Sequence, residues 1–581
     1  MAIKYTITPK NLHAHLFEVE LKLQNPNPLG QVFSLPSWIP GSYLIRDFAK
    51  NIVSIQAHCC EQVLEIKSID KNHWIASPCT GEITLSYKVY AFDLSVRSAY
   101  LTNERAFFNG TSVFLLPLGF ENEKCELSIK PAESSQTQGN WSIATGLKKI
   151  STLNFEANDY QDLIDHPVEM SDFTLFDFEV NNVKHQMALT GMQNADISRL
   201  KQDLKTICQH HVAFFNNDMP FDDYLFLTLV RTQGYGGLEH KNSCCLICSR
   251  KELPEINMGD INNEYTRFLA LCSHEYFHSW WVKTIKPANF HQLDLSRENY
   301  TEQLWIFEGF TSYYDELSLL RSKLLKPEQY LALFAQTVTR VQKSTGRFTQ
   351  SLAQSSYATW TKFYQQDENA PNAIVSYYTK GALLAFVLDI EIRKLTDNQK
   401  SLDNVLQYAW EHYQECGLEN NSIQIIVNQI TNSDLTQFFD DYLYGVKELP
   451  LQASFAYVGV KCEFVKHVKD LSDFGLSIKT QGEFSHITQV FSNSSAQYAG
   501  LYVGDKIVSV NYQQLKDKEL IAQINKHIEG DVIKVGILRD ELLLEISVAI
   551  GKITPSFCQL SLIPETNEKI TNQQRQWLYQ E

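Results

Sequence analysis

The sequence lacks the features of an exported or membrane-spanning protein. No run approaches the roughly eighteen apolar residues that a membrane span needs, and the longest candidates, such as GALLAFVLDI, have the length of a buried helix. The first residues, MAIKYTITPK, contain no apolar segment of the signal-peptide type. Internal repeats and low-complexity segments are also missing. These absences predict a folded chain that is neither secreted nor inserted in a membrane.

An excess of positive charge and a disulfide framework are missing too. The 581 residues include 51 Lys and Arg against 67 Asp and Glu, a net charge of −16, which argues against nucleic acid or an anionic membrane as partner. The 12 Cys are scattered, and CCLIC (244–248) has no second C-x-x-C pair at zinc-ribbon spacing. Its thiols are therefore expected to be buried in a strand. A reducing compartment, the cytoplasm, fits this pattern.

The sequence does contain HEYFH, residues 274–278, within a segment (262–285) whose apolar residues have helical spacing. Residues four apart lie on one helix face, so His274 and His278 can present two imidazoles to one metal ion. Glu275 lies beside the first ligand and can act as general base on a metal-bound water. Zinc would lower the pKa of that water and polarise a substrate carbonyl. A pair of solvated histidines is the alternative, which the flanking Trp and Phe residues do not suit.

A second helix-like segment, TEQLWIFEGFTSYYDELSLLRSKLL, supplies the expected third ligand. A catalytic zinc takes three protein ligands and keeps one position open for water, and Glu308 lies 30 positions beyond His278. Asp315, two turns further along the same face, is expected to accept a hydrogen bond from the free nitrogen of a ligand histidine. The sequence thus predicts one zinc ion per chain, because two histidines and a glutamate favour zinc among divalent ions.

HEYFH followed by EGFTSYY resembles the gluzincin metallopeptidases, and GYGGLEH is similar to the Gly-Ala-Met-Glu-Asn strand of the zinc aminopeptidases. In those enzymes the Glu of this strand binds the α-amino group of the substrate. The matching residue is Glu239, and Gly236 and Gly237 complete the predicted substrate-binding set. Leu238 and His240 depart from the pattern, although His240 resembles the glycyl aminopeptidase family. The physical need is clear, since an ammonium group in a closed site requires a carboxylate partner.

SYYTKGALLAFVLDI (376–390) resembles the Tyr-x-Lys-Gly-Ala helix of the same enzymes, whose Tyr donates a hydrogen bond to the oxyanion of the tetrahedral intermediate. Tyr378 occupies that place, and Tyr377 is the alternative. SLPSWIPGSYLIRDF (34–48) looks like the corresponding stretch of the glycyl aminopeptidase family. The resemblance therefore spans nearly the whole chain. It implies release of N-terminal residues, with small ones such as Gly and Ala preferred, from peptides that have a free N-terminus.

After Pro450 the sequence changes character and resembles a PDZ domain. FGLSIK matches the carboxylate-binding loop, which is predicted at Phe474, Gly475 and Leu476. A PDZ domain adds a bound peptide as an extra strand and holds its terminal carboxylate with backbone N–H groups. Peptide C-termini are therefore candidate partners. A module that only packs against the catalytic part is the alternative.

The expected fold is multidomain α+β. Strand-like alternation between Asn, Pro and Gly turns predicts an N-terminal all-β domain over residues 1–168. A thermolysin-like catalytic domain with a largely helical continuation is expected over 169–452, and a β-rich PDZ domain over 453–552. The tail, 553–581, is expected to dock as a short helix on the main body.

The predicted function is that of a cytoplasmic zinc aminopeptidase, with three alternatives open. An endopeptidase to which the PDZ domain delivers C-terminal tails is disfavoured by Glu239. The leukotriene hydrolase relatives open an epoxide at a similar zinc site, and spacing does not exclude that reaction. A non-catalytic PDZ adaptor on an inactive scaffold is less consistent with an intact ligand set. The sequence predicts no oligomeric state.

Overall fold

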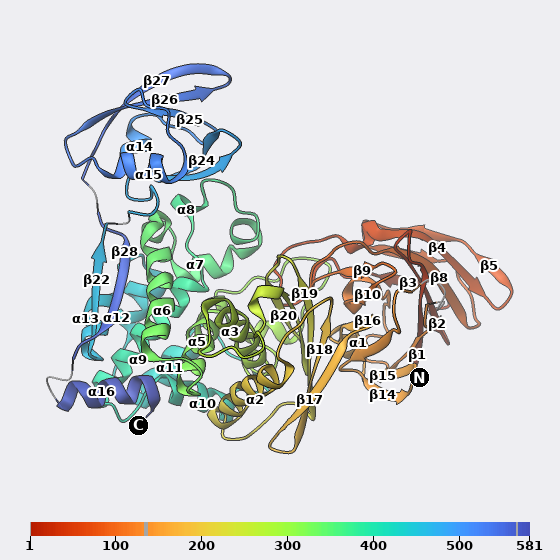
Figure 1. Ribbon diagram of the computed structural model, residues 1–581. Coiled ribbons are helices and arrows are strands. Elements are labelled where there is room, and N and C mark those ends of the chain that lie inside the picture. Colours follow the sequence, from red (N-terminus) through yellow and green to blue (C-terminus); the bar gives the residue numbers. More distant parts are fainter. Residues whose placement is uncertain (1, 133–136, 467, 553, 565–567, 581) are drawn as a thin grey trace. The chain divides into compact units, whose positions relative to one another are not determined.

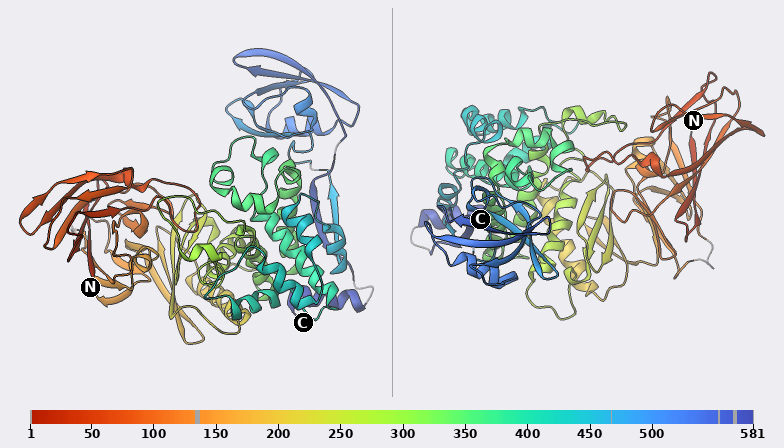
Figure 2. Two further views of the ribbon diagram at one scale, coloured as in Figure 1. Left: turned by 180° about the vertical axis from the view of Figure 1, so that it is seen from behind. Right: turned by 90° about the horizontal axis from the view of Figure 1, so that it is seen from above.

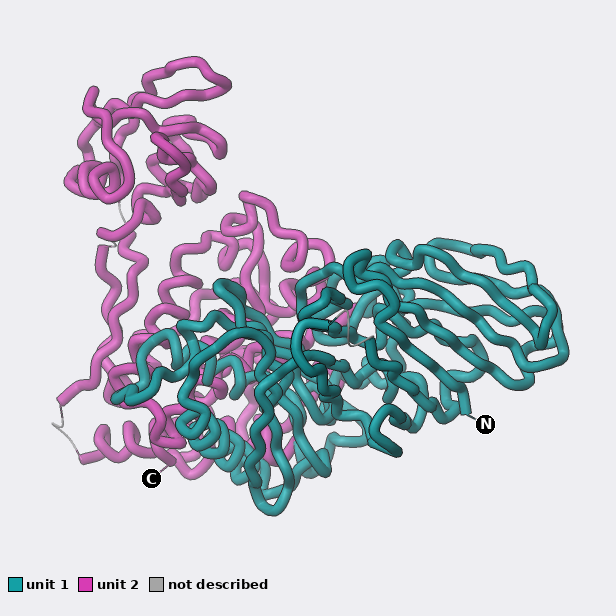
Figure 3. Tube along the Cα trace, turned by 45° about the vertical axis from the view of Figure 1, so that its right-hand side comes forward, with its two compact units in different colours: residues 1–299, 410–417 teal, residues 300–409, 418–581 magenta. Residues whose placement is uncertain are grey.

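The computed structural model describes residues 2–132, 137–466, 468–552, 554–564 and 568–580. The chain divides into two compact units, one of residues 1–299 and 410–417 and the other of residues 300–409 and 418–581 (Figure 3). This division falls inside the region 169–452 that the sequence suggested as a single domain. In the described part of the chain, no helix is long and apolar enough to cross a membrane.

Unit 1 begins with a region rich in β-strands (Figures 1 and 2). The main sheet has the order β14-β15-β12-β1-β2-β8-β4-β5. Alternation along β1 places Ile3, Tyr5 and Ile7 in the core, as the period of two requires. The strands of this sheet are β1 (Ile3–Asn11), β2 (Leu16–Leu23), β4 (Ile52–Cys59), β5 (Gln62–Leu64), β8 (Ile83–Tyr90), β12 (Cys125–Ile129), β14 (Lys148–Ser151) and β15 (Asn154–Ala157).

Two four-stranded sheets and a short helix complete this region. Helix α1 (Tyr160–Ile164) starts at Asp159, whose side chain accepts the N–H of Asp162. The last strand of the region, β16, continues to Ser171 and pairs with β10. The sheet strands are β3 (Gln31–Ser34), β6 (Ile66–Ser68), β7 (His73–Ala76) and β11 (Leu116–Pro117), and β9 (Ala99–Leu101), β10 (Arg105–Phe108), β13 (Ser142–Thr145) and β16 (Val168–Ser171).

A five-stranded sheet in unit 1 contains the predicted substrate strand, and helix α3 of the same unit carries the zinc motif. The sheet order is β17-β18-β19-β21-β20, so β20 (Gly236–Glu239) is an edge strand, antiparallel to β21 (Ser243–Ser249). Cys244, Cys245 and Cys248 are buried in β21, which confirms the reading of CCLIC as strand thiols. The other elements are β17 (Thr174–Val180), β18 (Val183–Thr190), β19 (Asp223–Arg231), α2 (Ile197–Phe214) and α3 (Asn263–Phe277).

Unit 2 is mainly helical before the PDZ region. Helix α4 ends at Phe307 and α5 begins at Gly309, so the expected continuous helix is interrupted at Glu308. The principal helices are α4 (Leu304–Phe307), α5 (Gly309–Arg321), α6 (Pro327–Lys343), α7 (Leu352–Tyr357), α9 (Thr379–Leu395), α11 (Ser422–Thr431) and α13 (Leu451–Tyr457). Helix α10 (Leu402–His412) follows α9 along the chain.

The PDZ region forms a five-stranded sheet with its own core around Leu476, Ile487 and Ile533. Its elements are β23 (Leu476–Gln481), β24 (Phe484–Val490), α14 (Ser495–Tyr498), β25 (Lys506–Val510), α15 (Asp517–Asn525), β26 (Val532–Arg539) and β27 (Leu542–Ala549). The flanking strands β22 (Val460–Val465) and β28 (Phe557–Leu562) pair with each other. The PDZ region is thus inserted between two paired strands.

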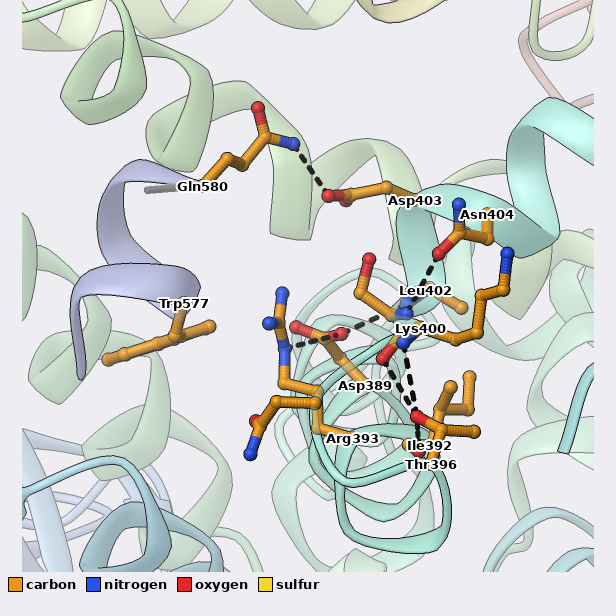
Figure 4. Close-up of polar contacts among 12 residues, drawn as sticks. Asp389, Ile392, Arg393, Thr396, Lys400, Leu402, Asp403, Asn404, Trp577 and Gln580 are labelled. Atoms are coloured by element: carbon orange, nitrogen blue, oxygen red, sulfur yellow. Dashed lines mark hydrogen bonds and ion pairs between the residues drawn. The ribbon is translucent and has the colours of Figure 1, made fainter. Parts of the chain in front are cut away.

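The chain ends in helix α16 (Glu568–Tyr579), which packs on the helices of unit 2. Trp577 is fully buried, and its ring centroid lies 5.3 Å from that of Phe386. The Trp577 indole N–H donates to the Tyr313 hydroxyl at 2.9 Å. Close by, the Gln580 amide donates to the Asp403 carboxylate at 2.6 Å (Figure 4). Burial of a Trp with its N–H satisfied anchors this helix.

Candidate metal centre and amine-binding strand

Helix α3 brings the two histidines of HEYFH together. The helix starts at Asn262, whose side chain accepts the N–H of Tyr265, and it ends at Phe277 with His278 as its C-cap. The rings of His274 and His278 have centroids 4.7 Å apart and are nearly perpendicular. The predicted continuation of this helix to residue 285 is wrong, because the chain turns tightly from residue 279 onwards, with Val282 at φ 108°.

A backbone carbonyl orients one of these rings. His278 is buried, and its Nδ1–H donates to the carbonyl oxygen of Trp281 at 2.9 Å. With Nδ1 used in this way, Nε2 carries the lone pair that a metal ion needs. The sequence predicts this orienting role for Asp315. For His278 the turn after α3 performs it, and Asp315 stays a prediction for the other ring.

Glu275 lies against the glycine pair of the edge strand. It is 5% exposed, and a Cβ on Gly237 would fall 1.9 Å from the Glu275 Oε1 atom. Only glycine therefore allows β20 to approach the carboxylate so closely. The neighbouring Gly236 is half-buried, and the Gly237 carbonyl accepts a hydrogen bond from Arg97 at 3.2 Å. The need for glycine in GYGGLEH is thus a close approach of backbone to side chain.

Glu239 is the last residue of β20, and its carboxylate faces the same region. Potential ligand atoms of Glu239, Glu275 and His278 lie within 4.8 Å of one another. Two carboxylates at this distance create a strongly negative potential, which favours a cation between them. The Glu239 carboxylate also packs on Gly41, where an added Cβ would lie 2.5 Å from Oε1. The strand end is therefore closed by the N-terminal region of the same unit.

A cavity of about 860 Å³ adjoins Glu239 within unit 1. Its lining includes the stacked pair Trp38 and Tyr43, and the ammonium groups of Lys283 and Lys286. The volume is in the range of pockets that bind small molecules. Burial and the neighbouring Lys283 lower the pKa of Lys286. The cavity therefore offers an aromatic surface next to Glu239, with both acidic and basic side chains in the rest of its lining.

Within unit 2, Glu308 and the Tyr-x-Lys-Gly segment lie on two tightly packed helices. Glu308 is 2% exposed, and its carbonyl oxygen accepts the N–H of Ser312 as α5 begins. A Cβ on Gly309 would lie 2.7 Å from the Gly381 Cα atom, so α5 and α9 meet at these two glycines. Small residues at a helix contact permit this spacing. The glycines of EGF and KGA thus set the distance between the two segments.

The structure distinguishes the two candidate tyrosines by burial. Tyr377 is fully buried, and its hydroxyl accepts a hydrogen bond from Thr359 at 3.0 Å. Tyr378 is half-buried at the N-terminus of α9, and its ring stacks on Phe363 with centroids 5.7 Å apart. Tyr377 is therefore committed to internal packing, which leaves Tyr378 as the candidate for contact with a substrate. Asp315 is half-buried on α5 and accepts the N–H of Glu316.

The predicted carboxylate loop of the PDZ region is closed by its own backbone. The N–H groups of Phe474, Gly475 and Leu476 all donate to the carbonyl oxygen of Leu471, at 3.1, 3.0 and 3.0 Å. Asp470 is held in turn by the Lys343 ammonium at 2.5 Å. The loop has the glycine conformation expected, with Gly475 at φ 101°. Its three N–H donors are nevertheless engaged within the chain.

Sequence reasoning missed several residues around Glu239. Arg97 and Asp165 contact the substrate strand or its turn, Lys283 pairs with Asp165, and Gly41 supports the carboxylate. The signal for Gly41 was present in SWIPGSY, a Pro-Gly segment with two aromatic residues. Arg97, Asp165 and Lys283 carry no local signal, because their partners are far apart in sequence.

Comparison with known proteins places these features in a family. Three family models match, namely the Peptidase M61 N-terminal domain over residues 4–172, M61 glycyl aminopeptidase over 267–384 and the PDZ domain over 472–550. The crystal structure of an aminopeptidase N family protein from Idiomarina loihiensis is 37% identical, covers 99% of this chain and 100% of that chain, and has a TM-score of 0.94. An M1 zinc metallopeptidase from Deinococcus radiodurans is 12% identical, covers 78% of this chain and 95% of that chain, and has a TM-score of 0.48. A comparison with curated proteins gives no match.

Proposed function

Because the chain belongs to the M61 glycyl aminopeptidase family and is a metallopeptidase, we propose that it is a zinc aminopeptidase that releases small N-terminal residues, Gly and Ala above all, from peptides. The observation that carries this proposal is the position of Glu239. A buried carboxylate at the closed end of an edge strand, next to Glu275 and His278, suits the ammonium group of a peptide N-terminus.

The proposed metal ligands are His274, His278 and Glu308. Two imidazoles and one carboxylate are a donor set of catalytic zinc sites, and these three residues supply it. The fit is supported by His278, whose Nδ1–H donates to the Trp281 carbonyl, so that Nε2 carries the lone pair that a metal ion needs. We propose one zinc per chain. When bound, zinc supplies Lewis acidity, which polarises the scissile carbonyl and acidifies water.

The chain's own residues then perform the proton and charge chemistry. Glu275 takes a proton from water at its carboxylate and returns it to the leaving amine. The Tyr378 hydroxyl donates a hydrogen bond to the oxyanion that develops on the carbonyl. Glu239 pairs with the substrate ammonium and fixes the peptide's register. Gly236 and Gly237 let the peptide backbone approach β20, and Asp315 is assigned to orient His274.

The rival peptidase reading is an endopeptidase, and Glu239 disfavours it. An endopeptidase groove must let the chain continue beyond the scissile residue, where Glu239 and Gly41 lie in van der Waals contact. A blocked N-terminus would also leave the carboxylate without its cation, which is costly in a buried site. We therefore expect a strong preference for free amino ends.

One assay tests the proposal. Gly, Ala and Leu anilides, each free and N-acetylated, are compared with and without a chelator, followed by zinc addition. We expect turnover of the free forms, fastest for Gly and Ala, with loss on chelation and recovery with zinc. Cleavage of N-acetylated substrates at rates comparable to the free forms would favour an endopeptidase over an aminopeptidase. Activity that survives chelation would contradict the proposed metal centre.

The PDZ region is proposed to be a packing module rather than a receptor for peptide C-termini. This proposal is supported by the three loop N–H groups that donate to Leu471.

A cytoplasmic location is supported by the cysteines, all twelve of which are unbridged in the described part of the chain.

A further inference from the structure

We propose that Asp165, His240 and Lys283 form a buried ion-pair network that positions Glu239 relative to the metal helix. The inference rests on the proposed role of Glu239 as the amine anchor. It assigns the N-terminal region a task in substrate binding, because Asp165 follows α1 of that region. The three residues are positioning residues, since each acts on the substrate only through Glu239.

The network centres on a single carboxylate oxygen. The Asp165 Oδ1 atom lies 3.2 Å from His240 Nδ1 and 2.8 Å from the Lys283 ammonium. His240 is 2% exposed, and it directly follows Glu239 in the sequence. Burial by itself would raise the pKa of Asp165, but Lys283 and His240 lower it overall. The carboxylate is therefore ionised, so it compensates the charge of the Lys283 ammonium and accepts a hydrogen bond from the His240 ring.

The turn after Glu239 is tied to the N-terminal region by two further side chains. The Lys241 ammonium pairs with Asp162 at 3.0 Å, and the Asn242 amide donates to the Gly146 carbonyl at 3.1 Å. Within the turn, the His240 N–H donates to the Ser243 carbonyl at 2.9 Å. Three successive side chains thus fix the β20–β21 turn, although only His240 joins it to Asp165.

The other end of the network is joined to helix α3. The Lys283 backbone N–H donates to the carbonyl oxygen of His278 at 3.0 Å, while its ammonium reaches Asp165. A continuous series of contacts therefore leads from His278 through Lys283, Asp165 and His240 to Glu239. This series sets the spacing between the last turn of the metal helix and the amine anchor. Small displacements of an anchor are costly in a site of this kind.

The experiment compares Asp165→Ala, His240→Ala and His240→Asn with the unmodified protein. In metal-free protein, hydrogen exchange at the backbone amide of residue 240 is expected to quicken in both alanine variants. With zinc bound, KM for the Gly anilide is expected to rise about tenfold, with kcat changed less than about threefold. The Asn side chain can donate to Asp165 in place of the imidazole, so His240→Asn should restore KM to within about threefold.

A matched control variant and a comparison of two inhibitors distinguish a positioning role from a general loss of structure. Glu156→Gln removes a carboxylate of the same region that also pairs with two ammonium groups, those of Lys124 and Lys148, at 2.5 and 2.6 Å, neither of which belongs to the network. It should leave both readouts unchanged. Glycine hydroxamate and acetohydroxamate differ by the amino group, and the ratio of their inhibition constants reports amine binding. That ratio should fall in Asp165→Ala and in His240→Ala.

The possible outcomes distinguish failure of the network inference from failure of the proposed function. If Glu239→Ala lowers the hydroxamate ratio and the two network alanine variants do not, the network inference is wrong while the proposed function stands. If Glu239→Ala itself leaves the ratio unchanged, the amine-anchor assignment is wrong. Unchanged hydrogen exchange at His240 in a folded Asp165→Ala protein also overturns the inference. Should Asp165→Ala not fold, His240→Ala and its Asn counterpart decide the question.

Discussion

The chain has two segments whose sequences predict that they hold the ends of peptides, the edge strand β20 and the PDZ loop. They differ in whether their binding groups are available. At the amine end, the Glu239 carboxylate adjoins a cavity of about 860 Å³. At the carboxylate end, the three N–H groups of the PDZ loop point at the chain's own Leu471 carbonyl. Both segments depend on a glycine, since Gly237 lets β20 approach Glu275 and Gly475 has φ 101°. The comparison teaches that a motif fixes backbone shape, whereas hydrogen-bond satisfaction decides whether a binding group is available.

The largest effect should come from Glu275, which lies beside the edge strand β20. Glu275→Gln keeps the size of the side chain against Gly237 but cannot accept a proton. We expect kcat on the Gly anilide to fall about 10³-fold, within the range of a lost general base, while the zinc content measured by elemental analysis is unchanged. A variant that keeps more than a tenth of the activity would show that another group takes the proton.

Glu239→Ala should break the amine side of the comparison itself. Leaving a buried ammonium without its carboxylate costs about 3–4 kcal/mol, so kcat/KM for free anilides should fall about 10²–10³-fold. The ratio of free to N-acetylated turnover should fall with it. Glu239→Gln preserves the contact with Gly41 and isolates the charge. If Glu239→Ala cleaves free and blocked substrates in the original ratio, Glu239 does not bind the amine.

How much of this site was readable from the sequence depends on the spacing of its partners. His274, Glu275 and His278 share a helix turn, and Glu308 and Tyr378 lie in glycine-containing segments of recognisable pattern. Gly237 was readable as a glycine but not as the contact point for Glu275. Asp165 and Lys283 are 118 residues apart, and their pairing arises only when the N-terminal region packs against the turn after α3. The fold class was predictable from alternation and helical periodicity, but helix ends such as Phe277 depended on turns without a sequence signal.

Gly41→Ala should sharpen the comparison by displacing the anchor without changing its charge. The added Cβ would lie 2.5 Å from Glu239 Oε1, and the backbone at φ 85° is unfavourable for alanine. We expect KM for the Gly anilide to rise about tenfold, with a smaller change in kcat. Gly119→Ala is the control, because its φ of 89° is similar and nothing lies within 4 Å of the added Cβ. Equal kinetics in the two variants would mean that backbone strain alone acts.

The smallest effect is expected at the PDZ loop, where the comparison predicts none. A terminal carboxylate would have to displace three N–H donors from the Leu471 carbonyl. Each hydrogen bond lost and each one formed contributes about 1 kcal/mol, so the net gain in binding free energy is small. Fluorescence anisotropy of full-length protein with a labelled apolar peptide should give the same affinity for its C-terminal acid and its amide. Lys343→Ala releases Asp470 from its ion pair and tests whether helix α6 keeps the loop closed. A tenfold preference for the acid in the unmodified protein would show that the PDZ loop, like β20, is available for binding. It would require the N–H groups to turn outward when the peptide binds.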